Sequence, residues 1–397
     1  MSQVSAAMNV RSNRLQQLPP YLFVEIDKKK RAKIAAGADI INLGVGDPDR
    51  PTPPFIVDAA AQAVRNPRYH QYPASVGNAE FRKSAARFMQ RRFGVDVDPD
   101  ANILTVIGSK EGIFKLPLAT VNAGETVIIP EPCYPVYMAG ATFADAKIHS
   151  LELKPEQGWL PDLDAIPPAA AQAAKLMWAN FPGNPTAASA PLEFYDRWVR
   201  FCSEHQIIAA SDNAYSEVYF EEPQPSMWQA PCADINTTYG IEFHSCSKTF
   251  NMTGWRVGFA VGHKDVIGAV ASLKGNTDSG CFEAVQEAAK AAFDHYDHPD
   301  IKAMVETYRE RRDIFCEGLQ ALGWDVPKPA ASFFIWGECP GGMDSWEFAN
   351  RALDEADMVL VPGAGISPNA KSYFRAALTV EADRMREAVD RLARIAW

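Results

Sequence analysis

Apolar runs and helical patterns alternate through the middle of the chain. Seven short runs rich in aliphatic and β-branched residues are separated in places by stretches with helical spacing, such as PLEFYDRWVRFCSEH (191–205). The seven runs cover residues 103–109, 126–130, 147–153, 175–182, 207–215, 241–247 and 256–262. Several are apolar throughout, which is typical of strands buried on both faces of a sheet. The alternation therefore predicts an α/β domain around a mostly parallel sheet.

The pattern changes after about residue 290. A long charged helical stretch is followed by strand-like runs and helical patterns, at 299–322, 331–338, 344–356, 358–363, 372–379 and 380–396. This order predicts a smaller α+β domain. We expect a large domain over residues 46–290 and a small domain formed by residues 1–45 together with 291–397. Ligands of such folds bind at the carboxyl ends of the large-domain strands, beside the domain boundary.

Composition and charge narrow the possible function classes. The 397 residues are 47% hydrophobic and carry a net charge of −10 without any basic block. This balance supports a sizeable core and disfavours nucleic acid and anionic membranes as partners. The sequence shows no apolar leader and no run long enough to span a bilayer. The seven cysteines are scattered without a CxxC pair, so we expect reduced thiols in a cytoplasmic enzyme, without disulfides or a metal site.

Polar residues follow three of the predicted strands. IGSKEG (107–112) lies where a strand ends and a helix begins, so its backbone N–H groups, with Ser109 and Lys110, can bind an anion. Asn184 lies in a Pro-rich turn after a second strand. Asp212 ends a third strand, where a buried carboxylate requires a cationic partner. Each feature also has a purely structural explanation, as a β–α turn, an Asx-turn or a helix cap.

Lys248 in SCSKTFNMTGWR (245–256) has three interpretations. It can be a surface lysine, the helper of a serine nucleophile, or the imine partner of an aldehyde cofactor. SCSK matches the SxxK motif of penicillin-binding proteins, with Ser245 as nucleophile and Lys248 as base, and SDN occurs at 211–213. However, SDN precedes SxxK here and no KTG is present, which disfavours a serine acyl-enzyme.

The imine interpretation accounts for more residues at once. Pyridoxal phosphate needs a lysine amine for its aldehyde and a carboxylate for its ring nitrogen. It also needs donors for its phenolate oxygen and a cationic cup for its phosphate. For these needs the chain offers Lys248, Asp212, Asn184 with Tyr215, and Ser109 with Ser245 and Arg256.

The order of the motifs resembles a known family. GVGDP, HQYP, GSKEG, NPT, DNAY, SxSK, WRVG and FRAALT together look like the fold-type-I pyridoxal-phosphate aminotransferases of class I/II, over nearly the whole chain. The resemblance implies pyridoxal 5′-phosphate as cofactor, with Lys248, Asp212 and Tyr215 as catalytic residues. Lys248 would form the imine, Asp212 would pair with the ring nitrogen, and Asn184 with Tyr215 would hold the phenolate oxygen. Tyr134 would stack on the ring, and the phosphate would be bound by Ser109, Lys110, Ser245, Ser247 and Arg256.

The resemblance also implies a homodimer with shared active sites, because Tyr72 would reach the phosphate of the neighbouring subunit. Arg375, with Asn184 beside it and Gly46 behind it, would bind the substrate α-carboxylate in a bidentate fork. The chain departs from the family at NPTA, because Ala187 stands where the family usually has glycine.

Several stretches look like one subgroup, the LL-diaminopimelate aminotransferases, including RNPRYHQYPASVGNAEFR and IEFHSCSKTFNMTGWRVGFAVG. The implied ping-pong reaction interconverts LL-2,6-diaminopimelate plus 2-oxoglutarate with tetrahydrodipicolinate plus glutamate, a step toward lysine and peptidoglycan. The far end of that substrate needs polar partners, for which the candidates are Tyr21, Lys110, Glu111 and Asn276. The alternatives are an N-succinyl-diaminopimelate, alanine or aspartate aminotransferase, and a β-lyase on the same scaffold.

Overall fold

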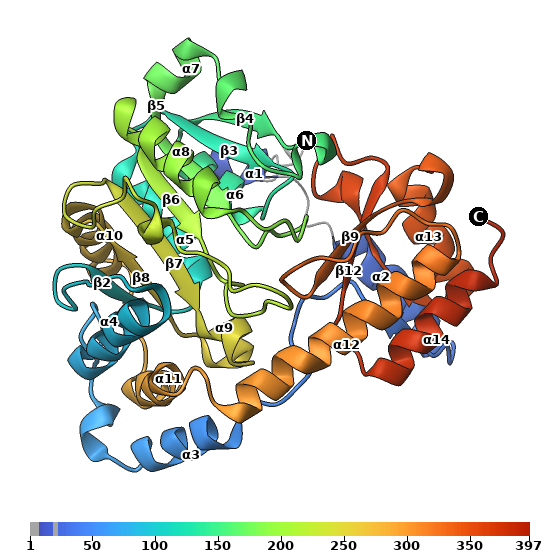
Figure 1. The fold of residues 1–397 in the computed structure, drawn as a ribbon, viewed down its shortest axis with the longest axis horizontal. Coiled ribbons are helices and arrows are strands. Elements are labelled where there is room, and N and C mark those ends of the chain that lie inside the picture. The colour runs from blue at the N-terminus through green and yellow to red at the C-terminus, as the bar shows by residue number, and fades with distance from the viewer. Residues whose placement is uncertain (1–7, 19–22) are drawn as a thin grey trace, which may run out of the picture.

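One seven-stranded sheet forms the centre of the larger part of the molecule. The structure is a computed structural model that describes residues 8–18 and 23–397. The strand order is β2–β8–β7–β6–β5–β3–β4 (Figure 1). The strands are β2 (Ile103–Val106), β3 (Thr126–Glu131), β4 (Lys147–Glu152), β5 (Ala174–Asn180), β6 (Ile208–Asp212), β7 (Gly240–Ser245) and β8 (Gly258–Gly262). All seven predicted strands are present, with ends that differ by a few residues from the apolar runs.

The sheet is mostly parallel, as predicted. Strands β4, β3, β5, β6 and β7 pair parallel in that spatial order, whereas β8 pairs antiparallel with both β7 and β2. Parallel strands end at the same edge of a sheet, so Asn180, Asp212 and Ser245, the last residues of β5, β6 and β7, lie at one edge. The predicted residues Asp212 and Ser245 therefore lie at the edge where α/β proteins bind ligands, and the predicted Asn184 follows the end of β5 by four residues.

Alternate residues of each strand pack into two separate apolar cores. In β5, Leu176 and Trp178 belong to one core, and Met177 and Ala179 belong to the other. The first core is closed by α5 (Ser109–Thr120), α6 (Val136–Phe143) and α10 (Lys264–Gly275). The second is closed by α4 (Ala79–Phe93), α8 (Leu192–Glu204) and α11 (Glu283–Asp294). Helices on both faces explain why nearly every residue of the central strands β5, β6 and β7 is buried.

The C-terminal part forms a second, smaller layer of sheet and helices, reached along the 23-residue helix α12 (Pro299–Ala321) (Figure 1). Its antiparallel sheet has the order β11–β12–β9. The elements are β9 (Phe334–Glu338), α13 (Ser345–Ala356), β10 (Met358–Val359), β11 (Val361–Pro362), β12 (Tyr373–Ala377) and α14 (Ala382–Ala393). These bounds agree closely with the helical and strand-like patterns of the sequence.

An N-terminal strand joins this C-terminal part. Strand β1 (Ile41–Asn42) pairs parallel with β10, which brings together segments more than 300 residues apart in the sequence. The remaining helices are α1 (Asn13–Gln17), α2 (Phe23–Ala35), α3 (Pro54–Ala63), α7 (Pro168–Ala173) and α9 (Cys246–Thr249). The division into residues 46–290 and the rest stays a prediction.

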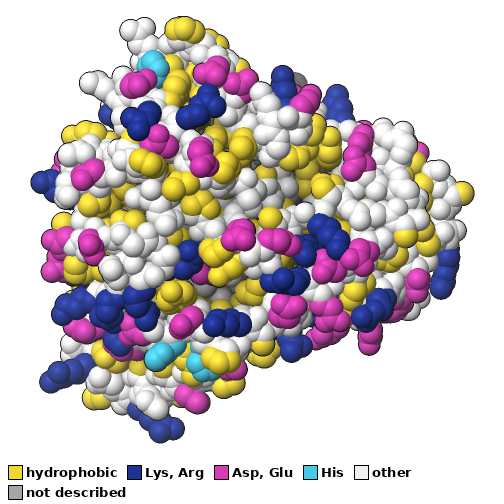
Figure 2. All heavy atoms as spheres, viewed as in Figure 1, with side chains coloured by type: hydrophobic (Ala, Val, Ile, Leu, Met, Phe, Trp, Pro, Cys, Tyr) yellow, Lys and Arg dark blue, Asp and Glu magenta, His cyan; other side chains and the backbone are white. Residues whose placement is uncertain are grey.

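Charges of both signs are mixed over the face of the molecule seen in Figure 2. Within the described residues, every helix is too short or too polar to span a lipid bilayer. The seven cysteines are free thiols. No group of three or more potential metal-ligating side chains is found in the part of the chain that the structure describes.

Candidate active site

Lys248 lies on the short helix α9, directly after β7, where its amine is held inside the protein. Its Nζ donates a hydrogen bond to the carbonyl oxygen of Gly46 at 2.9 Å, and it lies 5.5 Å from the centre of the Phe333 ring. Burial lowers the pKa of Lys248 to about 8; Asp47 opposes this shift, and the nearby Arg256 and Arg375 add to it. The amine can therefore lose its proton close to neutral pH.

Asp212 is a buried carboxylate at the carboxyl end of β6, only 4% exposed. The Tyr137 hydroxyl donates to its Oδ2 at 2.7 Å, whereas Oδ1 is buried and has no hydrogen-bond partner among the described residues. Burial raises the pKa of Asp212 to about 6, against the lowering effect of the Tyr137 hydrogen bond. A turn, and not a helix, follows Asp212, so the helix-cap explanation of this residue is wrong. Asp212 Oδ1 can therefore still accept a hydrogen bond from a cationic donor.

Arg375, Asn184 and Tyr215 come together from three distant parts of the chain. Arg375 in β12 donates from Nη1 to Asn184 Oδ1 at 3.0 Å and from Nη2 to the carbonyl oxygen of Gly44 at 2.9 Å. Its guanidinium carbon lies 4.4 Å from the centre of the Phe334 ring. Burial raises the pKa of the Tyr215 hydroxyl, as does the charge of Asp212. The Tyr215 hydroxyl thus lies within reach of the charges of both Asp212 and Arg375.

The backbone carbonyl that accepts a hydrogen bond from Arg375 is not that of Gly46, as expected from the sequence. Gly44, not Gly46, accepts its hydrogen bond, while Gly46 accepts from Lys248. Gly46 is required as glycine because a Cβ there would lie 2.5 Å from atoms of the Phe334 ring. The segment Gly44–Gly46 therefore supports both cationic side chains.

A second group of residues converges at the N-terminus of α5. A Cβ added to Gly108 would lie 2.4 Å from Nη2 of Arg256, so the guanidinium packs directly on this glycine. Arg256 Nη1 also donates to Ser247 Oγ at 3.4 Å, and Ser109 is the first residue of the helix. Ser245 Oγ accepts from the backbone N–H of Ser247 at 3.2 Å and caps α9. Helix N–H groups, hydroxyls and a guanidinium form a suitable cup for a phosphate.

Other predicted residues lie around this centre. Lys110 is exposed in the first turn of α5. Tyr134 is half-buried, with its ring edge-on to that of Tyr137 at 5.8 Å. Tyr72 is 90% exposed, and Tyr21 lies outside the described residues. Ala187 has a φ of 54°, a backbone conformation that favours glycine and accounts for the usual family residue at this position.

One distal-substrate candidate is occupied by other protein groups. Glu111 accepts from the backbone N–H of Ile107 at 2.8 Å and pairs with Lys115 at 2.6 Å and Lys274 at 3.3 Å. Its carboxylate therefore stabilises the start of α5, and we no longer expect it to bind substrate. Asn276 is exposed and donates to the carbonyl oxygen of Ser272 at 2.8 Å.

Tyr137, Gly44, Phe333 and Phe334 contact the site but were not among the residues predicted from the sequence. Tyr137 follows Tyr134 by one helical turn in EPCYPVYM, and the two phenylalanines open a predicted strand. Neither pattern carries chemistry by itself, because aromatic residues at such places usually belong to the core. Their contacts with charged groups of the site appear only when distant segments are brought together.

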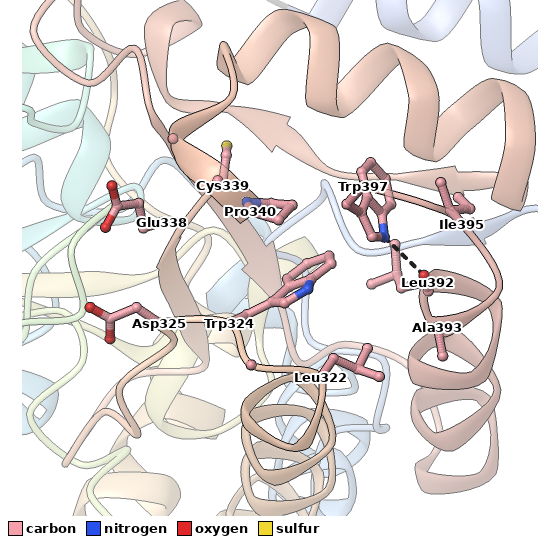
Figure 3. Close-up of a pocket in the computed structure, with 13 residues that line it drawn as sticks. Leu322, Trp324, Asp325, Glu338, Cys339, Pro340, Leu392, Ala393, Ile395 and Trp397 are labelled. Atoms are coloured by element: carbon pink, nitrogen blue, oxygen red, sulfur yellow. Dashed lines mark hydrogen bonds between the residues drawn. The ribbon is translucent and has the colours of Figure 1, made fainter.

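A pocket of about 590 Å³ lies elsewhere, in the C-terminal part (Figure 3). Trp324, Trp397, Glu338 and Asp325 contribute to its lining, and none of the predicted site residues does. We therefore place the chemistry at the sheet edge and not in this pocket.

The observed groups fit pyridoxal phosphate. The open Oδ1 of Asp212 suits a protonated ring nitrogen, because a buried carboxylate oxygen gains most from a cationic donor. The cup at Gly108 and Arg256 suits the phosphate, and an amine with a pKa near 8 suits an aldehyde.

Because Lys248 is buried, its pKa should be measurably lower in the folded protein than in the denatured chain. In cofactor-free protein, the modification rate of Lys248 by trinitrobenzenesulfonate should rise to a midpoint near pH 8, followed by mass spectrometry of its peptide. In the denatured chain the midpoint should lie near the ordinary lysine pKa of about 10.4. Because the folded pKa is lower than the unfolded pKa, this group should add to the free energy of unfolding as the pH rises between these two values. Equal midpoints in the two states would contradict a buried amine.

Comparisons with known proteins agree with this geometry. Residues 38–392 match the family model of the aminotransferases of class I and II. The chain is 48% identical to the LL-diaminopimelate aminotransferase of Aquifex aeolicus over 383 residues, which cover 96% of this chain and 98% of that protein. It is 46% identical to LL-diaminopimelate aminotransferase 2 of Trichormus variabilis, covering 96% and 97%.

Solved structures show the same fold. Apo-BacF from Bacillus subtilis has a TM-score of 0.92 at 35% identity and covers 98% of both chains. Aspartate aminotransferase from Thermus thermophilus, with maleate, has a TM-score of 0.90 at 28% identity and covers 98% of this chain and 100% of that chain. With a family match over nine-tenths of its length and relatives above 40% identity, the chain belongs to the class I and II aminotransferases, which are pyridoxal-phosphate-dependent enzymes of fold type I.

Proposed function

We propose that the enzyme transfers an amino group between LL-2,6-diaminopimelate and 2-oxoglutarate, giving tetrahydrodipicolinate and glutamate. The observation that carries the substrate is the identity of 43–48% over nearly the full length to eight relatives named LL-diaminopimelate aminotransferase. The amine of Lys248, whose pKa is lowered by burial and influenced by Arg375 and Asp212, supports the chemistry of amino transfer.

Lys248 is the proton carrier in this proposal. Bound pyridoxal phosphate supplies an aldehyde that holds the amino group and a conjugated ring that accepts electrons from the substrate Cα. With a pKa near 8, Lys248 Nζ can take the proton from Cα and release it again at neutral pH. In this structure, the Gly46 carbonyl oxygen accepts a hydrogen bond from this nitrogen at 2.9 Å and holds it in place.

Arg375 and Asp212 are proposed to set the position and charge of the reactants. Arg375 binds the substrate α-carboxylate through its two Nη atoms, which now donate to Asn184 and Gly44. Asp212 holds a proton on the ring nitrogen, and the Tyr137 hydroxyl keeps its carboxylate in place. Asn184 and Tyr215 bind the phenolate oxygen, and Tyr134 stacks on the ring.

The phosphate cup and the assembly are part of the same proposal. The phosphate is bound by Ser109, Lys110, Ser245, Ser247 and Arg256. We propose a cytoplasmic homodimer, in which the exposed Tyr72 reaches the partner's phosphate; a tyrosine that is 90% exposed in the single chain is available for such a contact. Lys110 and Asn276 are the described candidates for the far end of the substrate.

The serine acyl-enzyme has less support than transamination. Ser245 Oγ caps α9, and Lys248 donates to Gly46. An N-succinyl-diaminopimelate donor stays an alternative, because a probable N-succinyldiaminopimelate aminotransferase of Thermus thermophilus has a TM-score of 0.88 at 29% identity. Alanine or aspartate as donor, and β-elimination, are further outcomes for experiment.

A panel of amino donors tests the proposed substrate. With 2-oxoglutarate as acceptor, LL-diaminopimelate should give a kcat/KM at least about 100-fold above aspartate, alanine and aromatic donors, since unpaired polar groups at the far end cost several kcal/mol. Meso- and N-succinyl-diaminopimelate test stereochemistry and the free far-end amine. Preference for another donor would overturn the substrate. A donor with a thioether leaving group on Cβ, such as cystathionine, tests the β-lyase: release of a thiol, pyruvate and ammonia without amino exchange would indicate that activity.

A further inference from the structure

Arg311 is a completely buried guanidinium on α12, at 0% exposure. A buried charge persists only when it is paired and hydrogen-bonded. Arg311 meets this need with a fork on Asp49, in which Nη1 lies 2.7 Å from Oδ1 and Nη2 lies 2.8 Å from Oδ2. Nη1 also donates to the carbonyl oxygen of Leu378 at 3.0 Å, and Nη2 to Glu381 Oε2 at 3.2 Å.

These acceptors belong to the two backbone segments beside Arg375, the residue proposed to bind the substrate α-carboxylate. Asp49 ends the segment Gly44–Asp49, whose Gly44 and Gly46 carbonyl oxygens accept from Arg375 and Lys248. Leu378 directly follows β12, the strand of Arg375. The Arg311 guanidinium therefore connects residues 44–49, which accept hydrogen bonds from Arg375 and Lys248, to the end of β12, the strand that carries Arg375.

The two segments run side by side as far as Arg311. The backbone N–H of Ala377 donates to the carbonyl oxygen of Leu43 at 2.7 Å. Thr379 Oγ1 donates to the carbonyl oxygen of Val45 at 2.9 Å. Further along the two segments, Arg311 links them again, because it binds Asp49 of one and the carbonyl oxygen of Leu378 of the other. Without it, residues 46–49 would keep one fewer anchor to the C-terminal part.

We infer that Arg311 is a positioning residue: its fork on Asp49 and Leu378 holds the Gly44 and Gly46 carbonyls where they orient Arg375 and Lys248. This inference rests on the proposed roles of Arg375 and Lys248. Arg311 does not contact the reacting atoms in this account. It acts through the backbone of residues 44–49, and small displacements of such a frame are costly, with about 100-fold lost for a 1 Å error.

The adjacent Arg312 is a matched control. It is 5% exposed on the same helix, and its Nη1 donates to Glu221 at 2.6 Å and to the carbonyl oxygen of Pro329 at 3.0 Å. Both partners lie outside residues 44–49 and β12. Loss of Arg312 therefore removes a buried guanidinium with an acidic partner from the same helix without releasing the candidate site.

The test compares Arg311→Lys, Arg311→Met and Arg312→Met in the full chain with cofactor. A lysine keeps the charge but cannot make the planar fork, so Arg311→Lys should lower kcat/KM for the amino donor by about 10- to 100-fold, mainly through KM. Arg312→Met should change KM less than about twofold, even if it lowers Tm equally. Asp49→Asn, which weakens the same fork from the other side, serves if Arg311→Met fails to fold.

The titration of Lys248 gives a readout that does not depend on activity. Asp47, Asp212, Arg256 and Arg375 face this amine, and burial is the main cause of its low pKa. Loosening residues 44–49 admits water, so the labelling midpoint in cofactor-free Arg311→Lys should move up from about 8. It should stay unchanged in Arg312→Met.

Two results would separate failure of the inference about Arg311 from failure of the proposed function. If Arg311→Lys and Arg312→Met lowered Tm alike while KM and the Lys248 midpoint stayed at the wild-type values, Arg311 would be structural only and the inference would be overturned. If wild-type enzyme transferred amino groups from no donor, the proposed function would fail, but the midpoint comparison would still decide whether Arg311 positions Lys248.

Discussion

Lys248→Ala is expected to reduce kcat/KM for every amino donor by about 10⁴-fold or more, the largest effect of any single substitution in this chain. The variant loses the amine that holds the cofactor aldehyde and the group that moves the Cα proton. Lys110, the other lysine assigned to the site, is exposed in the first turn of α5 and is not expected to replace Lys248. Coupled detection of glutamate from 2-oxoglutarate measures the loss.

Folding of this variant should be largely intact. Lys248 makes one hydrogen bond to a carbonyl oxygen, worth about 1 kcal/mol, and its buried ammonium opposes folding at neutral pH. Tm should therefore stay within a few degrees of wild type, measured without cofactor. Lys302→Ala, at an exposed position on α12, is the control for removing a lysine. Appreciable turnover by Lys248→Ala would reject the central assignment.

Asp212→Ala should have the second-largest effect, a loss of about 10²- to 10³-fold in kcat, comparable with removing a preorganised electrostatic group from other active sites. The carboxylate is buried, with one oxygen held by Tyr137 and the other without a hydrogen-bond partner among the described residues. Its removal leaves the ring nitrogen without an anionic partner, so the proton there is lost at neutral pH. Steady-state kinetics together with the dissociation constant of the cofactor measure both consequences.

Tyr137→Phe separates the charge of Asp212 from its support. The hydroxyl is the leading influence that lowers the pKa of Asp212 against burial, so its loss should raise that pKa above about 6. We expect about a 10-fold lower kcat at neutral pH, partly recovered at higher pH, as one hydrogen bond to a charged group contributes 1.5–3 kcal/mol. The same kcat as wild type at every pH would show that the Tyr137 hydroxyl does not support the Asp212 carboxylate. For the preceding prediction, an Asp212→Ala variant with wild-type kcat would show that the ring nitrogen needs no carboxylate.

The elements of the fold were predictable because their signals are local. The run 207–215 is apolar because β6 is covered on both faces, and the charged stretch 299–322 became α12. Asp212 and Lys248 were recognisable from short stretches of sequence. A carboxylate at the end of an apolar strand is unusual there, and so is the lysine within SCSK. Their ordered spacing then indicated the family.

Contacts across the chain were not predictable in the same way. Glu111 was expected near the far end of the substrate, but it binds the Ile107 N–H and two lysines. Gly44 and not Gly46 supports Arg375, because the register between residues 43–45 and 377–379 sets which carbonyl faces the guanidinium. A slip of one or two residues is invisible in a sequence in which both positions are glycine.

The amino-acid sequence alone was enough to predict the α/β architecture, because the apolar runs and helical patterns that indicate it lie within short stretches of chain. It also predicted Lys248 as the reactive amine, through the order of several motifs along the whole chain. Only the tertiary structure decided how strongly that amine is buried, which oxygen of Asp212 stays open, and that Arg311 joins Asp49 to Leu378. Proton affinity and orientation depend on packing and on hydrogen bonds between segments hundreds of residues apart. Those quantities exist only once the chain has folded.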